Sequence, residues 1–182
     1  PKSSATIVPS LAQSIDMFFE INPKNIDQRL VNDAVKALKR GNIVIFPTDS
    51  VYAVGCDLNN KKALHQLAKF KGERLNKVHF SIICKDIAEL SAHTKHLNKP
   101  TFKLLKQCLP GPFTFILSGS SSIPKMFDSK KKEIGVRITE NAITQALVET
   151  LGNPIACTSL HDEKEPLLES VSYTHLTLPT SF

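Results

Sequence analysis

The chain has 182 residues, of which 41% are hydrophobic and 22% are charged, a balance typical of one folded domain rather than of a disordered chain. No apolar run approaches the roughly 20 residues that a membrane-spanning helix needs, so we expect no membrane partner. The net charge of +6 favours ligands that carry phosphate, either a nucleotide or a nucleic acid, although a basic protein without such a ligand would have the same charge.

The first half of the chain is predicted to alternate between helices and buried strands. Apolar residues at three- and four-residue spacing predict a helix from Asn25, its N-cap, to Arg40, and Gly41 ends it. A β-branched run predicts a strand at 43–46, which Pro47 ends. The next predicted elements are an extended segment at 51–56, a helix at 60–70, a strand at 79–84 and a short helix at 87–92.

The second half of the chain continues this alternation. Its predicted elements are a helix at 98–109, strands at 113–117 and 134–138, a helix at 141–151 and a strand at 155–158. Proline is tolerated in a first helical turn, so Pro100 fits the start of the first of these helices, and Gly152 ends the second. Because helices and strands interleave, the predicted fold class is α/β, in one domain with a partly parallel sheet.

The two ends of the chain differ in composition from the rest. Residues 1–16 show no clear periodicity, and residues 170–182 carry no charge and many Ser and Thr residues. The string VSYTHLTLPTS resembles the translation of a sequencing adapter, with an ordinary polar tail as the alternative. We therefore expect a domain at 17–169 that is incomplete at its C-terminus, flanked by non-native or disordered extensions at 1–16 and 170–182.

The cysteines and histidines indicate no metal site. Four cysteines stand far apart without a CxxC pair, at Cys56, Cys84, Cys108 and Cys157. Single cysteines in apolar segments are typical of small core residues in a reducing compartment, so we expect a cytoplasmic protein. His93 and His96 lie three residues apart in a polar stretch, which is typical of solvated surface rather than of a metal ligand pair.

The common nucleotide-binding motifs GxGxxG and GxxxxGK[ST] are absent, so a nucleotide would be held by Lys, Arg and backbone groups at strand ends. Thr48 and Asp49 follow a strand that proline ends, where they form either a ligand site at a sheet edge or a simple turn. The basic residues between 69 and 77 suit phosphate groups, with a solvated helix end as the alternative.

Two further polar residues interrupt apolar strands. Thr114 follows the stiff Pro110-Gly111-Pro112 turn, and a hydroxyl in an otherwise apolar strand needs either a ligand or a neighbouring strand as its partner. Arg137 lies between Val136 and Ile138, so its guanidinium group either pairs with a buried carboxylate or points at an anion.

The order of these motifs along the chain is similar to that of a known protein family. The segments PTDSVYAVGC, KGER, LPGPFTFIL, IGVRI and the late Thr-Ser pair resemble the YrdC/YciO family over residues 17–169, and FFEINP and PTDSVYAVGC are most similar to its YciO branch. The resemblance implies an open, strongly twisted mixed α/β sheet flanked by helices, with a concave basic surface.

The resemblance also implies an activity. Members of the family include L-threonylcarbamoyladenylate synthases, nucleotidyltransferases that condense L-threonine, bicarbonate and ATP into threonylcarbamoyl-AMP and release pyrophosphate, with Mg²⁺ transiently present. Their product is used in tRNA modification, and members have been associated with double-stranded RNA. The expected partners are therefore ATP, L-threonine, bicarbonate and tRNA or double-stranded RNA.

Individual residues acquire roles through this resemblance. Lys71 and Arg74 would stabilise the charge that develops when a carbamate oxygen attacks the α-phosphate of ATP. Thr48 and Tyr52 would line the threonine pocket. The implied catalytic residues are Lys71, Arg74 and Ser159, and the implied substrate-binding residues are Thr48, Tyr52, Thr114, Arg137, Thr158 and His161.

The sequence departs from the synthase pattern at two places. Synthases read K-x-R, whereas Glu73 stands two residues after Lys71 and the arginine falls at Arg74. They also read S-x-N, whereas here His161 stands two residues after Ser159, in the place of the asparagine. His161 is either a substitute for that asparagine or part of a polar loop. These departures keep two alternatives open. One is a non-catalytic, RNA-binding YciO-type paralogue that associates with tRNA or ribosomes, and the other is a carbamoyl-transfer module similar to that of hydrogenase-maturation proteins.

Overall fold

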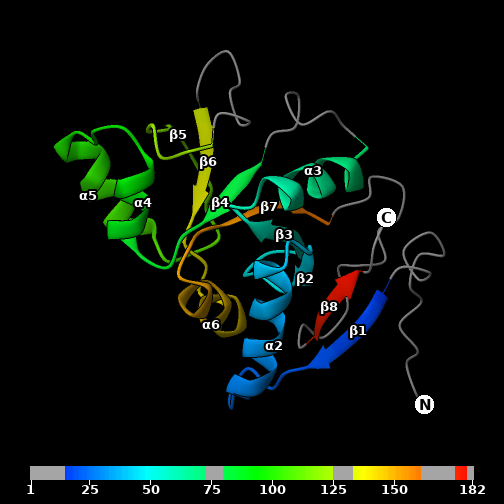
Figure 1. Ribbon diagram of the computed structural model, residues 1–182. Helices are drawn as coiled ribbons and strands as arrows, with labels where there is room; N and C mark the ends of the chain where they lie inside the picture. The colour runs from blue at the N-terminus through cyan, green and yellow to red at the C-terminus, as the bar shows by residue number, and fades with distance from the viewer. Residues whose placement is uncertain (1–14, 73–79, 125–132, 161–174, 180–182) are drawn as a thin grey trace.

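One mixed sheet of eight strands organises the computed structural model, which describes residues 15–72, 80–124, 133–160 and 175–179, without the side chains of 15–20 and 175–179 (Figure 1). The strands follow one another across the sheet in the order β1-β8-β2-β3-β7-β4-β6-β5. They are β1 (Ile15–Glu20), β2 (Val44–Phe46), β3 (Ala53–Asp57), β4 (Ser81–Ile83), β5 (Phe115–Ser118), β6 (Glu133–Arg137), β7 (Ile155–Ser159) and β8 (His175–Pro179). Within the described ranges β4 and β6 are the one parallel pair, and this confirms the predicted partly parallel α/β sheet.

Five helices flank the sheet in the described part of the chain. They are α2 (Gln28–Lys39), α3 (Lys61–Phe70), α4 (Ile87–His93), α5 (Lys99–Cys108) and α6 (Ala142–Leu151). Each begins after a side chain that accepts a free N–H of the first turn, and the last four begin within one residue of the predicted position. The predicted cap of the first helix was wrong: Asp27 accepts from the Arg29 N–H at 2.9 Å, and Asn25 instead bonds back to Asn22.

The edge formed by β1 and β8 was not predicted. The backbone of β8 pairs with β1 and, through one residue pair, with β2. Burial of Leu176 and Leu178 in the core would argue against a non-native extension, but the side chains of β8 lie outside the described part of the structure. Our expectations for residues 1–16 and 170–182 therefore stay predictions.

The alternation of side chains along the strands divides the core into two layers. One layer packs Val54, Ile82 and Val136 of the sheet against α3, α4 and α5. The other packs Phe46, Ile155 and further strand residues against α2 and α6, which lie side by side on their face of the sheet (Figure 1). Because each fully buried Leu, Ile or Phe side chain contributes roughly 1.5–3 kcal/mol, both layers are needed to hold the sheet. None of the helices in the described residues is long and apolar enough to cross a membrane.

Gly55 of β3 lies very close to residues of the neighbouring strands β2 and β7. A Cβ atom at this position would lie 2.7 Å from Ile155 Cγ2, 2.8 Å from the Ala156 carbonyl oxygen and 2.9 Å from Phe46 Cε1. Two of these atoms belong to the neighbouring strand β7, so little room exists for relaxation. Gly55 is therefore required for packing of the central strands.

We predict that Gly55→Ala lowers the free energy of unfolding by about 1–3 kcal/mol, because the added methyl group overpacks this contact. Urea denaturation measures the effect. Lys62→Ala on the exposed side of α3 is the control and should stay within about 0.5 kcal/mol of the original protein. An unchanged urea midpoint for Gly55→Ala would contradict the packing argument.

Three of the four cysteines, Cys56, Cys84 and Cys157, are buried, as predicted for core residues, and Cys108 is partly exposed. Burial raises the pKa of Cys157 to about 12, and it raises the pKa values of Cys56 and Cys84 further still. Because the thiolate is the reactive form, these three side chains are inert at neutral pH.

We predict that a disulfide reagent at about pH 8 labels Cys108 first in the native protein, and that the other three thiols react only as the chain unfolds in urea. The absorbance of the released chromophore counts the reacted thiols over time. Fast reaction of all four thiols without urea would show that the two core layers open readily.

Candidate active site

A cavity of about 230 Å³ lies beside the ends of several strands of the sheet. It is lined by Val51, Ala53, Lys71, Ser81, Thr114, Arg137, Cys157, Thr158 and Ser159. These described residues include two cationic side chains and four hydroxyl groups but no carboxylate. A wall of this chemistry suits an anionic ligand that also carries polar groups.

Two small residues of the sheet, Ser81 and Cys157, line part of the cavity. On the sheet face that carries α2 and α6, Ser81 of β4 pairs with both Gly135 of β6 and Cys157 of β7. A Cβ atom at Gly135 would lie only 2.5 Å from Ser81 Oγ and 3.1 Å from Thr114 Cγ2. Ser81 and Thr114 thus occupy the space above Gly135, and the small side chains of Ser81 and Cys157 line the cavity on a face that elsewhere carries Phe46 and Ile155.

Lys71 reaches the cavity from the end of α3. It is the C-cap of that helix, and Gly72 follows with a φ of 70°, a left-handed conformation that turns the chain away. The Lys71 Nζ atom donates to Thr158 Oγ1 at 3.0 Å, so the ammonium group lies at the end of β7. Within the described residues the Lys71 side chain makes this one hydrogen bond, and its ammonium group has two further N–H groups that can donate to an anion.

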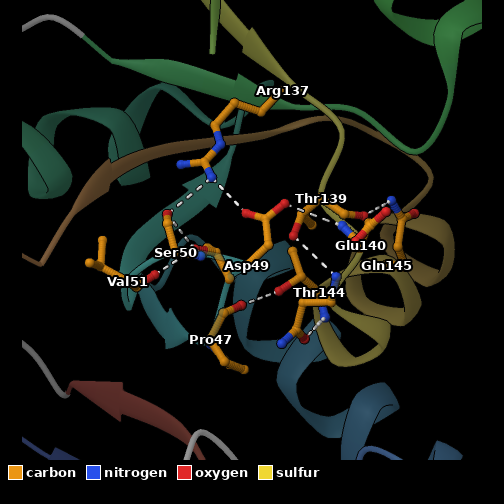
Figure 2. A network of polar contacts seen from close by, with 11 residues as sticks. Pro47, Asp49, Ser50, Val51, Arg137, Thr139, Glu140, Thr144 and Gln145 are labelled. Atoms are coloured by element: carbon orange, nitrogen blue, oxygen red, sulfur yellow. Dashed lines mark hydrogen bonds and ion pairs between the residues drawn. The ribbon is translucent and has the colours of Figure 1, made fainter. Parts of the chain in front are cut away.

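Arg137 is held by the loop between β2 and β3 (Figure 2). Its Nη2 atom donates to Asp49 Oδ1 at 2.7 Å and to Ser50 Oγ at 3.2 Å, and the side chains of Arg137 and Asp49 are only 14% and 9% exposed. Of the two alternatives that the sequence left open for Arg137, pairing with a carboxylate is the one found. Arg137 nevertheless lines the cavity as well.

The same loop keeps Thr48 and Tyr52 out of the cavity wall. Thr48 is buried, donates its hydroxyl to the Val51 carbonyl at 2.5 Å and accepts from the Ser50 N–H at 3.2 Å. Tyr52 is buried in the core layer under α3. Neither is among the residues that line the cavity, so their assignment to a threonine pocket stays a prediction.

The structure brings five of the predicted site residues to one cavity: Lys71, Thr114, Arg137, Thr158 and Ser159. Arg74 and His161 lie outside the described residues, and the binding roles of all of them stay predictions. Sequence reasoning missed Ser81, although a hydroxyl within the apolar strand HFSIIC is the same signal that identified Thr114. It also missed the role of Asp49 as the partner of Arg137, which depends on the pairing of distant segments.

The cavity offers neither an activated nucleophile nor a metal-binding cluster in its described part. Burial raises the pKa of the Cys157 thiol to about 12, and the nearby Arg137 charge lowers it only partly, so the thiol stays protonated at neutral pH. The described residues contain no group of three or more His, Cys, Asp or Glu side chains that could hold a metal ion. Binding, orientation and charge stabilisation are what these residues can supply.

Comparison with known proteins assigns the chain to a family. The family model Sua5/YciO/YrdC, described as "Telomere recombination", matches residues 36–178. The "Uncharacterized protein YciO" of Escherichia coli K12 is 39% identical over 148 residues, which cover 80% of this chain and 70% of that protein. The crystal structure of E. coli YciO superposes with a TM-score of 0.74 at 37% identity and covers 81% of this chain and 71% of that one.

Two further relatives have lower sequence identity to the chain. The threonylcarbamoyl-AMP synthase of Coxiella burnetii is 28% identical over 146 residues, which cover 80% of this chain and 78% of that protein. The structure of P. abyssi Sua5 complexed with L-threonine superposes with a TM-score of 0.69 at 25% identity and covers 74% of this chain and 39% of that one. Because the family model spans well over half of its residues, the chain belongs to the Sua5/YciO/YrdC family.

Proposed function

We propose that the protein is a nucleotidyltransferase of the threonylcarbamoyl-AMP synthase type, which uses ATP, L-threonine and bicarbonate. The observation that carries the proposal is the cavity itself, where Lys71 and Arg137 meet four hydroxyl groups and no carboxylate among the described lining residues. The names of two relatives support it, since one is a threonylcarbamoyl-AMP synthase and the other was solved with L-threonine.

The proposed reaction requires no covalent intermediate with the protein. The amine nitrogen of threonine bonds to the carbon of bicarbonate, a C–O bond of bicarbonate breaks, and water leaves with the amine proton, so that a carbamate forms. A carbamate oxygen then attacks the α-phosphorus of ATP. The bond from that phosphorus to the bridging oxygen breaks, and pyrophosphate leaves with the electron pair. The increase in negative charge is stabilised by the Lys71 ammonium group, which Thr158 holds at the end of β7.

Mg²⁺ would enter this reaction together with ATP as part of the substrate. Magnesium is commonly bound by substrate phosphates plus one or two carboxylates. The described cavity wall holds no carboxylate, so these residues do not fit a resident magnesium ion. The contribution of the chain is the cationic and hydroxyl groups that orient the phosphates.

A second candidate function is RNA binding without catalysis, and the net charge of +6 favours it. RNA binding requires no synthase chemistry, so the departures from the synthase pattern at Glu73 and His161 would not impair this function. Titration of double-stranded RNA at several salt concentrations tests it, because phosphate contacts weaken steeply as salt rises.

We predict that Lys71→Ala lowers kcat/KM for pyrophosphate release from ATP, L-threonine and bicarbonate by about 100-fold or more, because a charge-stabilising donor is lost. The rate of pyrophosphate release, with threonine or bicarbonate omitted in parallel, measures this coupled reaction. Lys62→Ala is the matched control, since it removes the same charge from an exposed position of the same helix.

The two candidate functions give different results in these assays. Equal rates for Lys71→Ala and Lys62→Ala would contradict the assigned role of Lys71. An original protein that binds double-stranded RNA but releases no pyrophosphate would overturn the synthase proposal in favour of the second candidate.

A further inference from the structure

The guanidinium group of Arg137 has an uneven set of partners. Both hydrogen bonds that it makes with described residues come from one nitrogen, Nη2, to Asp49 and Ser50. The Nε atom is buried and makes no hydrogen bond within the described part of the chain. A buried N–H without an acceptor is costly, and the same side chain also lines the cavity, so the guanidinium group has hydrogen-bonding capacity that the described residues do not use.

Asp49 uses both of its carboxylate oxygens. Oδ1 accepts from Arg137 at 2.7 Å, and Oδ2 accepts from the backbone N–H of Glu140 at 3.4 Å (Figure 2). An asparagine at this position could accept only one of these two bonds, because its amide nitrogen is a donor. The position therefore requires a carboxylate for geometric as well as electrostatic reasons.

The loop that carries Asp49 is itself anchored. The Thr48 hydroxyl donates to the Val51 carbonyl and so closes the loop. The Thr144 hydroxyl of α6 donates to the Pro47 carbonyl (Figure 2). Asp49 thus occupies a fixed point between β2 and α6. From that point the Asp49 carboxylate orients the side chain of Arg137 on β6.

We propose that Asp49 is a positioning residue of this site: it fixes the Arg137 guanidinium so that its remaining N–H groups meet the phosphate groups of the substrate. The inference rests on the proposed function, since it takes the anion to be ATP or pyrophosphate. Asp49 is not among the residues that line the cavity, and it acts through Arg137.

Charge alone predicts the opposite effect of removing Asp49. The carboxylate partly cancels the charge of Arg137, so its loss makes the cavity more positive and would tighten the binding of anions. If Asp49 orients the guanidinium group, its loss weakens binding despite the more favourable charge. The sign of the change therefore separates the two roles.

The first part of the test observes the guanidinium group directly by NMR with ¹⁵N-labelled arginine. The chain has only four arginines, Arg29, Arg40, Arg74 and Arg137, and Arg137→Lys assigns the signal. In the original protein, the two Nη groups of Arg137 should give separate signals because rotation is hindered. In Asp49→Asn these signals should merge, and in the control Asp33→Asn, which breaks an exposed ion pair of 2.8 Å with Lys36, they should stay separate.

The second part measures the affinities for ATP and pyrophosphate by calorimetry. Asp49→Asn should weaken both by about tenfold or more, and Asp33→Asn should leave both unchanged. If Asp49→Asn does not fold, Ser50→Ala, which removes the longer of the two contacts to Nη2, should show a smaller loss of the same sign.

Each outcome decides a separate question. Tighter or unchanged anion binding in a folded Asp49→Asn protein, or unchanged Arg137 signals, would overturn the positioning role. If the original protein binds neither ATP nor pyrophosphate, the proposed function is what fails, and the NMR signals alone still decide whether Asp49 holds Arg137.

Discussion

A sheet that is covered by helices on both faces has space for a ligand only where its side chains are small. In this protein Gly135, Ser81 and Cys157 lie next to one another in one row across three strands, and Ser81 and Cys157 line the cavity. The rest of the same face carries Phe46, Ile83 and Ile155, which pack against α2 and α6. Two residues of the cavity wall, Ser81 and Cys157, therefore lie where this face changes from large to small side chains.

The two cationic side chains of the cavity, Lys71 and Arg137, come from the ends of elements beside it. Lys71 reaches in from the end of α3, where the chain already leaves the sheet, and Arg137 stands at the last position of β6. A guanidinium group that is largely withdrawn from water needs a compensating partner, and Asp49 is that partner at 2.7 Å. The site therefore combines one cation that a buried carboxylate compensates, Arg137, with one more exposed cation, Lys71.

Local sequence signals predicted most of the elements because their causes are local. Asn60, Asp86, Asn98 and Asn141 each cap the helix that follows them, and Gly41 adopts the positive φ that ends α2. Both Asn25 and Asp27 are residue types that can cap a helix, and the sequence pattern alone did not decide between them. Asp27, not Asn25, is the N-cap of α2. Strand β1 was missed because it is stabilised by pairing with β8, far away along the chain.

The site itself was predictable only in part, for the same reason. Single polar residues in apolar strands identified Thr114 and Arg137, but the choice between a carboxylate and an anion as the partner of Arg137 depends on which loop lies beside β6. Sequence patterns do not fix that juxtaposition, and they also do not reveal that Ser81 and Gly135 share a row of the sheet. Only the resemblance to a family joined these segments before the structure did.

The two polar contacts beside the cavity have a consequence for synthesis of the chain. Lys71 and Thr158 are 87 positions apart, and Asp49 and Arg137 are 88 positions apart. As the ribosome adds residues in order, the early member of each pair emerges well before its partner exists, and contacts of such long range form slowly. During that interval Lys71 and Asp49 are charged groups without their native partners, so the nascent chain has some residues of the cavity and its rim but not yet the cavity.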